Sequence, residues 1–206
     1  MDWYFDFISP YSYLQLERLP PWPEKVALVP KPVLLAGLLG HWGQKGPAEI
    51  PAKRVFTYRQ VQWLAERAGV PFRFPPRHPF NPVSVLRLAV ALNDDLEAIR
   101  TIFRYIWAEG GEVDTPAGWA KLANRLRVPD ADAKVADPEV KAKLRANGDA
   151  AIAAGVFGVP TLVVDGMVFW GYDSTEMARD YLNDRGRFET AEMRRIEKLP
   201  EGARRA

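Results

Sequence analysis

The chain has 206 residues, of which 48% are hydrophobic and 26% charged, and its formal net charge is +2. This composition is typical of one globular domain, or of one domain with a large insertion, and it excludes a disordered chain, a collagen and a coiled-coil rod. No apolar run is long enough for a membrane span, the N-terminus lacks the basic region of a signal peptide, and the balanced charge gives no reason to expect a nucleic-acid partner.

The first predicted element is a strand over residues 3–8, where aromatic and β-branched side chains follow one another. Both of its faces are largely apolar, which predicts a central strand with Asp6 partly buried. Ser9 followed by Pro10 predicts the start of a short helix, which the prolines at positions 20 and 21 end. A second strand is predicted over residues 26–30, with a proline limiting it at the end.

Helical spacing dominates residues 32–143, and this stretch has no strand pattern. Glycine and proline interrupt it at residues 40–51 and again in the proline-rich stretch 71–82. The predicted helices cover residues 55–68, 83–92, 96–107, 115–126 and 138–154.

The strand pattern returns over residues 160–164 and 167–170, and Asp165-Gly166 between them predicts a hairpin turn. A last helix is predicted over residues 176–182, with residues 173–175 as its cap. Neither terminal piece is large enough to fold alone, so we expect both to share one mixed sheet.

The predicted fold class is therefore α/β. Residues 1–31 and 144–206 form one discontinuous domain in this interpretation, and residues 32–143 form an inserted all-helical domain. The basic pairs at 194–195 and 204–205 are interpreted as a solvated end of the chain.

Cysteine is absent, and the chain has two histidines, His41 and His78. We therefore expect no disulfide, no metal site built from thiolates or several histidines, and no cysteine nucleophile. Any thiol chemistry would need a thiol that arrives with a ligand. The absence of cysteine favours a cytoplasmic protein.

Each candidate site residue also has a plain structural interpretation. Ser9 lies at a helix N-terminus, which favours an anion but also suits a simple helix cap. Asp173 suits a cap of the last helix, Lys53 a solvated position, and the segment 159–161 an ordinary strand start. A Ser-His-Asp hydrolase is disfavoured, because the chain has no G-x-S-x-G motif.

Two motifs at opposite ends of the chain carry a resemblance to a known family. Residues 6–14 (DFISPYSYL), together with residues 157–161 (FGVPT) and 169–173 (FWGYD), resemble the 2-hydroxychromene-2-carboxylate isomerases. That family groups with the kappa-class glutathione transferases and the wider DsbA-like proteins. Residues 45–47 and 51–53 resemble its glutathione-contacting loop, so the similarity extends over nearly the whole chain.

The resemblance implies a thioredoxin-like fold with an inserted helical domain, in which residues 9–12 replace the usual C-x-x-C. It also implies a cis Val159–Pro160 bond, where glutathione docks on the backbone like an added strand with its thiol beside Ser9. Asp173 would accept the γ-glutamyl ammonium group, and Lys53 would pair with the glycyl carboxylate. The implied glutathione-binding residues are Ser9, Gln44, Lys53, Val159, Pro160, Trp170, Gly171, Tyr172 and Asp173, with Ser9 catalytic and no metal.

The sequence departs from the family pattern at three positions near this predicted site. Gln44 stands where asparagine is frequent, Tyr172 where serine or asparagine is found, and Ser174 where arginine is frequent. Lys45, Arg77 and Arg87 are candidates for holding a substrate carboxylate.

The implied activity is glutathione-dependent isomerisation of 2-hydroxychromene-2-carboxylate to trans-o-hydroxybenzylidenepyruvate, as in the degradation of naphthalene-type aromatics. It would use reversible thiol addition to a conjugated carbon and rotation about the resulting single bond. The alternatives are a kappa-type glutathione transferase or peroxidase, and a catalytically silent or chaperone-like glutathione-binding relative. The expected partner is a small aromatic substrate, with no nucleic acid and no membrane, and a homodimer stays a hypothesis.

Overall fold

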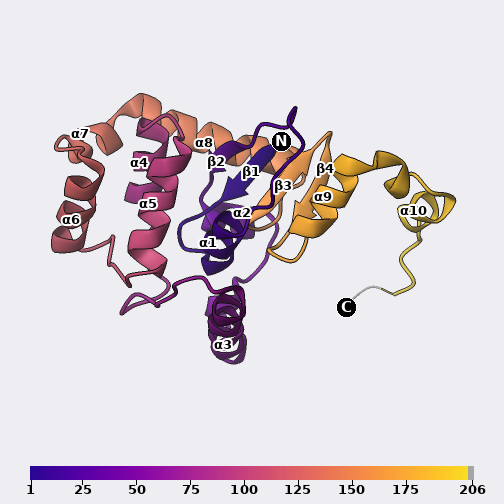
Figure 1. The fold of residues 1–206 in the computed structure, drawn as a ribbon, viewed down its shortest axis with the longest axis horizontal. Coiled ribbons are helices and arrows are strands. Elements are labelled where there is room, and N and C mark those ends of the chain that lie inside the picture. Colours follow the sequence, from indigo (N-terminus) through magenta and orange to yellow (C-terminus); the bar gives the residue numbers. More distant parts are fainter. Residues whose placement is uncertain (204–206) are drawn as a thin grey trace.

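Strands from the two ends of the chain form one four-stranded mixed sheet in the order β2-β1-β3-β4. The computed structural model describes residues 1–203 (Figure 1), so Arg204 and Arg205 of the predicted solvated end lie outside the described residues. Strand β1 (Asp2–Phe5) pairs parallel with β2 (Val29–Pro32) and antiparallel with β3 (Thr161–Val164), which pairs antiparallel with β4 (Met167–Trp170). The shared sheet is thus confirmed.

Strand β1 ends three residues earlier than predicted. The N–H of Ile8 donates to the Asp6 carboxylate, and the N–H of Ser9 donates to the Asp6 carbonyl, so the backbone turns immediately after Phe5. Trp3, Phe5 and Phe7 still lie on one face, fully buried, with the Trp3 and Phe5 rings stacked at 4.4 Å. The turn therefore brings Ser9 to the carboxyl end of β1, which is an inner strand of the sheet.

Strand β2 was predicted over residues 26–30 and lies instead at Val29–Pro32, at the edge of the sheet. The N–H group of Val29 donates to the carbonyl of Met1, just before β1, and the N–H group of Val33 donates to the carbonyl of Phe5, at the end of β1. Pro30 and Pro32 alternate with these donors, so the missing N–H groups of the prolines face away from β1. An edge strand tolerates such prolines, which is why the strand extends past the point where proline was expected to end it.

Ten α-helices complete the fold of the described residues. They are α1 (Pro10–Glu17), α2 (Leu35–His41), α3 (Pro51–Ala68), α4 (Val83–Ala91), α5 (Leu96–Trp107), α6 (Pro116–Leu126), α7 (Ala131–Ala136), α8 (Pro138–Ala153), α9 (Thr175–Asn183) and α10 (Ala191–Ile196). The predicted helices are confirmed within a few residues. Helices α2, α7 and α10 were not predicted, because α2 has two glycines and no side-chain cap, α7 is short, and α10 buries no residue.

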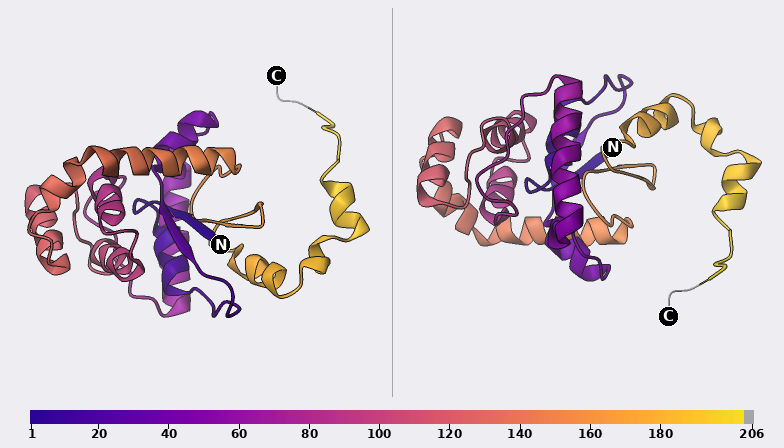
Figure 2. Two further views of the ribbon diagram at one scale, coloured as in Figure 1. Left: turned by 90° about the horizontal axis from the view of Figure 1, so that it is seen from above. Right: turned by 90° about the horizontal axis from the view of Figure 1, so that it is seen from below.

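The helices α4 to α7 gather on one side of the sheet, and α8 runs from them back to β3 (Figures 1 and 2). Helix α1 packs against α5 and also contacts α3, which lies below α1 in the view of Figure 1, apart from the α4–α7 group. Beyond α9 the chain leads away from the sheet through α10. The sheet and α1 are therefore covered on one side by the α4–α7 group, which we call the helical segment, and α1 contacts α3 on another side.

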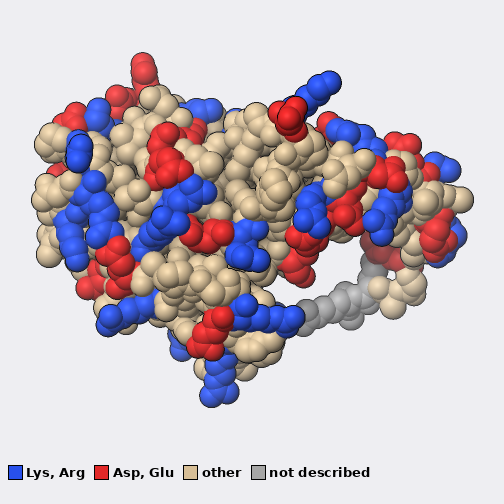
Figure 3. Space-filling view, in the orientation of Figure 1, with Lys and Arg blue, Asp and Glu red and all other residues tan. Residues whose placement is uncertain are grey.

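Two surface properties bear on the expected surroundings of the protein. Basic and acidic side chains are interspersed over the face drawn in Figure 3. Within residues 1–203, no helix combines the length and the apolar character needed to cross a membrane.

Candidate functional site

Ser9 immediately precedes helix α1 and is buried, with 6% of its surface exposed. Its hydroxyl oxygen accepts the N–H of Ser12 at 3.2 Å, so the predicted helix cap is confirmed. The aligned peptides of α1 place a partial positive charge at this end of the helix. An anion held beside Ser9 would therefore meet both a hydroxyl donor and the positive end of a helix.

The Val159–Pro160 bond is cis, as predicted, and it immediately precedes strand β3. Among the described residues, the N–H and C=O of Val159 find no backbone partner, whereas the Pro160 carbonyl accepts the N–H of Gly171 at 2.8 Å. This leaves one free N–H and one free C=O, on two successive peptide bonds, at the start of a strand. An extended peptide could bind there by main-chain hydrogen bonds.

The turn from Trp170 to Asp173 lies beside residues 158–160. Trp170 is 53% exposed, and its ring lies 5.1 Å from that of Phe157. Gly158 allows this arrangement, because a Cβ atom there would lie 2.6 Å from the indole nitrogen of Trp170. Gly171 has a φ of +99°, and a Cβ atom there would lie 2.5 Å from the Asp173 carboxylate. A side chain at either position would therefore displace Trp170 or Asp173, and at Gly171 it would also strain the backbone.

Asp173 does not cap the last helix, and this structural interpretation was wrong. The cap residue of α9 is Ser174, whose hydroxyl bonds to the Gly171 carbonyl instead of a helix N–H. The Asp173 carboxylate is exposed and has no hydrogen-bond or ion-pair partner in the described part of the chain. Its charge helps to raise the pKa of Tyr11, although burial of the Tyr11 phenol is the larger cause. Asp173 therefore lies within electrostatic reach of the first turn of α1.

Gln15 connects the Ser9 helix to this turn, and sequence reasoning missed it. Its fully buried side chain accepts the indole N–H of Trp3 and donates to the hydroxyl of Thr175 and the carbonyl of Gly171. The one available signal was a polar residue between Leu14 and Leu16 in an otherwise buried helix. This network fixes α1, the turn at Gly171 and the start of α9 relative to one another.

The remaining predicted residues lie on separate segments. Lys53 is exposed in the first turn of α3, and Gln44 is exposed in the loop after α2. Neither side chain has a hydrogen-bond or ion-pair partner within the described residues, and no contact joins them to Ser9 or Asp173. Helix α3 itself is tied to α1, because the Tyr11 hydroxyl donates to the Gln60 amide oxygen at 2.7 Å.

The candidates for a substrate carboxylate differ in availability. Arg77 forms ion pairs with Glu112 and Asp114, which lie in the connection between α5 and α6, so its charge is already compensated. Arg87 has a buried Nε atom without a hydrogen-bond partner among the described residues, and Lys45 is exposed.

Neither histidine provides a base for Ser9. The Nε2 atom of His78 lies 2.9 Å from the Ile8 carbonyl, and its Nδ1 atom lies 2.6 Å from the Tyr58 hydroxyl. Both ring nitrogens are thus engaged away from the Ser9 hydroxyl. Burial lowers the pKa of His78, and the hydrogen bond to Ile8 opposes this shift. The bond from His78 to Pro79 is also cis, which was not predicted.

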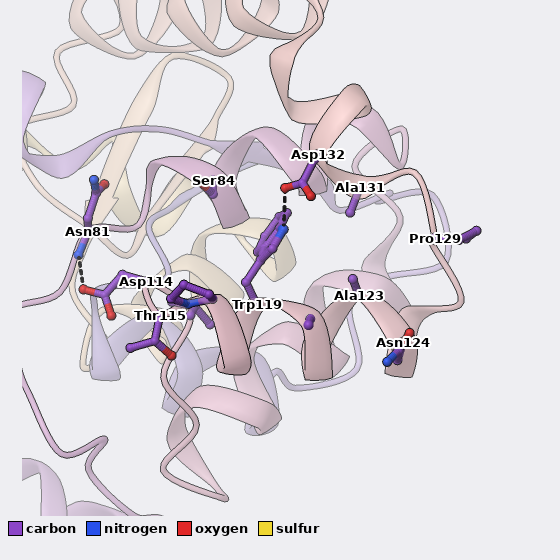
Figure 4. Close-up of a pocket in the computed structure, with 13 residues that line it drawn as sticks. Asn81, Ser84, Asp114, Thr115, Trp119, Ala123, Asn124, Pro129, Ala131 and Asp132 are labelled. Carbon is purple, nitrogen blue, oxygen red and sulfur yellow. Dashed lines mark hydrogen bonds between the residues drawn. The ribbon is translucent and has the colours of Figure 1, made fainter.

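A hollow of about 600 Å³ lies elsewhere, among α4, α6 and α7 (Figure 4). None of the predicted site residues lines it. Its two carboxylates already have partners, since Asp132 accepts the indole N–H of Trp119 and Asp114 pairs with Arg77. We therefore place the candidate site at Ser9, not in this hollow.

Glutathione, the ligand that the resemblance implies, carries two carboxylates, an ammonium group, two peptide groups and a thiol. Asp173 supplies a free carboxylate, Lys53 a free ammonium group and Val159 a free peptide edge. The chain has no cysteine of its own. The predicted residues therefore carry the charges and backbone groups that such a ligand would require.

Comparison with known proteins gives a consistent result. Residues 1–183 match the family model described as a DSBA-like thioredoxin domain. The chain is 31% identical to glutathione S-transferase kappa 2 of Caenorhabditis elegans, over 88% of this chain and 91% of that protein. It is 29% identical to the 2-hydroxychromene-2-carboxylate isomerase of Sphingobium xenophagum, over 89% and 98% of the two chains. A solved structure of 2-hydroxychromene-2-carboxylate isomerase matches with a TM-score of 0.74 at 22% identity, covering 93% of this chain and 98% of that one.

Proposed function

This chain belongs to the DSBA-like thioredoxin family, in the group that contains kappa-class glutathione transferases and 2-hydroxychromene-2-carboxylate isomerases, and from this premise we propose that it is a glutathione-dependent isomerase. The proposed reaction converts 2-hydroxychromene-2-carboxylate to trans-o-hydroxybenzylidenepyruvate. The observation that carries the proposal is Ser9 at the start of α1, in a chain without cysteine and with a free peptide edge at Val159.

When bound, glutathione supplies the thiol nucleophile that this chain lacks. The Ser9 hydroxyl and the positive end of α1 stabilise negative charge beside them and so favour the thiolate. The N–H and C=O groups of Val159 hold the ligand backbone. The backbone from Trp170 to Tyr172 helps to hold the γ-glutamyl carboxylate. Pro160 and Gly171 shape this edge, through the hydrogen bond from the Gly171 N–H to the Pro160 carbonyl.

Three side chains would bind the polar ends of the ligand. Asp173 pairs with the ammonium group, Lys53 with the glycyl carboxylate, and the Gln44 amide bonds to a peptide group. All three are exposed in the described structure. The extra length of Gln44 relative to asparagine, and the ring of Tyr172, distinguish this site from the family pattern.

A kappa-type glutathione transferase is the second candidate, because a relative at 31% identity carries that name. Purified protein should be incubated with glutathione and 2-hydroxychromene-2-carboxylate, and separately with glutathione and an aromatic halide. An isomerase interconverts the first substrate while the glutathione concentration stays constant. A transferase consumes glutathione in proportion to the halide. A protein that binds glutathione and does neither is a non-catalytic relative.

Asp173→Ala is expected to weaken glutathione binding by about 1.5–3 kcal/mol, the range for a hydrogen bond to a charged group. Calorimetric titration of the ligand-free protein with glutathione measures this loss. The matched control is Asp149→Ala on α8, which removes another exposed carboxylate without an ion pair in the described residues. Equal affinities of the two variants would contradict the assigned role of Asp173. Absence of glutathione binding by the unaltered protein would contradict the proposed function as a whole.

A further inference from the structure

The backbone that leads into Ser9 is held by ring N–H donors at two successive carbonyls. The indole N–H of Trp107, in α5, donates to the Phe7 carbonyl at 2.9 Å. The Nε2 atom of His78 lies 2.9 Å from the Ile8 carbonyl. A carbonyl only accepts hydrogen bonds, so Nε2 must carry a proton and donate it.

The Ile8 peptide is fixed from its other side as well. Its N–H donates to the Asp6 carboxylate at 3.0 Å, and the following N–H, of Ser9, donates to the Asp6 carbonyl at 3.0 Å. His78 thus completes the set of hydrogen bonds that determine where Ser9 begins α1. Without His78, the Ile8 carbonyl has no donor among the described residues.

The orientation of the His78 ring is itself determined by Tyr58. The Tyr58 hydroxyl lies 2.6 Å from Nδ1 and 2.9 Å from the carbonyl of His78, so it contacts the ring and the backbone of one residue. Aromatic rings pack around the imidazole, with centroid distances of 6.1 Å to Phe74, 6.0 Å to Phe80 and 5.4 Å to Trp107. These neighbours restrict the rotation of the ring.

Tyr58 belongs to α3, whose first turn carries Lys53. The path from Tyr58 through His78 to Ile8 therefore connects the helix that presents Lys53 to the turn that presents Ser9. We propose that His78 and Tyr58 are positioning residues, which hold the Ser9 hydroxyl and α3 in one fixed arrangement for the thiol-bearing ligand. This inference rests on the proposed function for the role of Ser9.

The first test uses the ligand-free protein, so it does not depend on glutathione binding. His78→Phe keeps an aromatic ring and removes the N–H donor, whereas His78→Gln keeps a donor of similar reach. Amide hydrogen exchange at Ile8 and Ser9 should be about tenfold faster in His78→Phe and close to the original rate in His78→Gln. Unchanged exchange at both amides in a folded His78→Phe protein would overturn the proposal.

Tyr58→Phe is the second variant, and it covers the case in which His78→Phe does not fold. Its matched control is Tyr105→Phe, which removes a hydroxyl donated to the Gly118 carbonyl in the helical segment. Tyr58→Phe should accelerate exchange at Ser9, and Tyr105→Phe should not. Equal acceleration in both variants would indicate general loosening of the structure and overturn the assignment.

The last readout addresses the ligand. In His78→Phe, the ultraviolet titration of bound glutathione should show a higher thiol pKa, and turnover should fall about ten- to a hundredfold while glutathione affinity stays within twofold. His78→Gln should restore much of both. A bound thiol pKa identical in all variants would contradict the positioning role. Failure of the unaltered protein to bind glutathione would refute the proposed function, while the exchange experiment would still decide whether His78 and Tyr58 position Ser9.

Discussion

Ser9→Ala is expected to lower turnover about 10²–10³-fold while most of the affinity for glutathione is retained. Removing one preorganised donor from a site where negative charge develops has effects of this size. The binding groups at Asp173, Lys53 and Val159 lie on other segments, so they are unaffected. The pKa of the bound thiol should rise, because the thiolate loses a hydrogen-bond donor. Its ultraviolet absorbance, titrated against pH in both proteins, measures this change.

The helix cap must be separated from the effect on the thiolate. Ser9→Ala removes the acceptor of the Ser12 N–H and should cost roughly 0.5–2 kcal/mol of stability. Ser9→Asp restores a good cap but places a negative charge beside the thiolate. We expect Ser9→Asp to recover stability and to lose turnover. Recovery of turnover along with stability would show that Ser9 acts only as a cap.

Ser12→Ala provides a matched control from the same turn of α1. The Ser12 hydroxyl is fully buried, so a bound ligand does not reach it and its removal should leave the thiol pKa unchanged. Mass spectrometry during turnover adds a further check. Ser9 has no base within the described residues, so we expect no covalent adduct on its hydroxyl. An adduct on Ser9 would replace the proposed mechanism by one with a serine nucleophile.

Local patterns in the sequence predicted those elements whose hydrogen bonds are themselves local. The hairpin at Asp165-Gly166 is one example, since both residues have positive φ and join β3 to β4 directly. The cap at Ser9 is another, because its donor is three residues away. The end of β1 was misjudged because the pattern of side chains does not reveal that Asp6 turns the backbone.

The residues that organise the site escaped prediction because their partners are distant in the chain. Gln15 bonds to residues 156 and 160 positions away, and His78 bonds to a carbonyl 70 positions away. Such contacts exist only after these distant parts of the chain have folded against one another. Periodicity describes which face of an element is buried, but it does not identify which distant segment meets that face.

Asp6 is the second residue at which a large effect is expected, and the measured quantity is the free energy of unfolding as a function of pH. The carboxyl group is fully buried, and burial raises its pKa from 3.8 to about 7, against the hydrogen bonds donated by the N–H groups of Leu35, Ile8 and Phe7. A carboxyl group with a higher pKa in the folded chain binds more protons when folded. Stability is therefore greatest below pH 4 for this group and falls as the pH rises to about 7.

The loss amounts to roughly 4 kcal/mol at 1.36 kcal/mol per pKa unit. Asp6→Asn is uncharged like the protonated carboxyl group, but its amide nitrogen cannot accept a hydrogen bond, so the N–H of Ile8 or of Leu35 loses its acceptor. The variant should therefore be less stable than the original protein at pH 4, by about 1–3 kcal/mol. Relative to the original protein, it should gain stability as the pH rises from 4 to 8. Denaturant unfolding at several pH values measures the difference, in which the contributions of other titrating groups cancel. A difference independent of pH would show that Asp6 is ionised throughout. The three backbone N–H groups would then outweigh burial, and the turn before Ser9 would be held by a permanent charge.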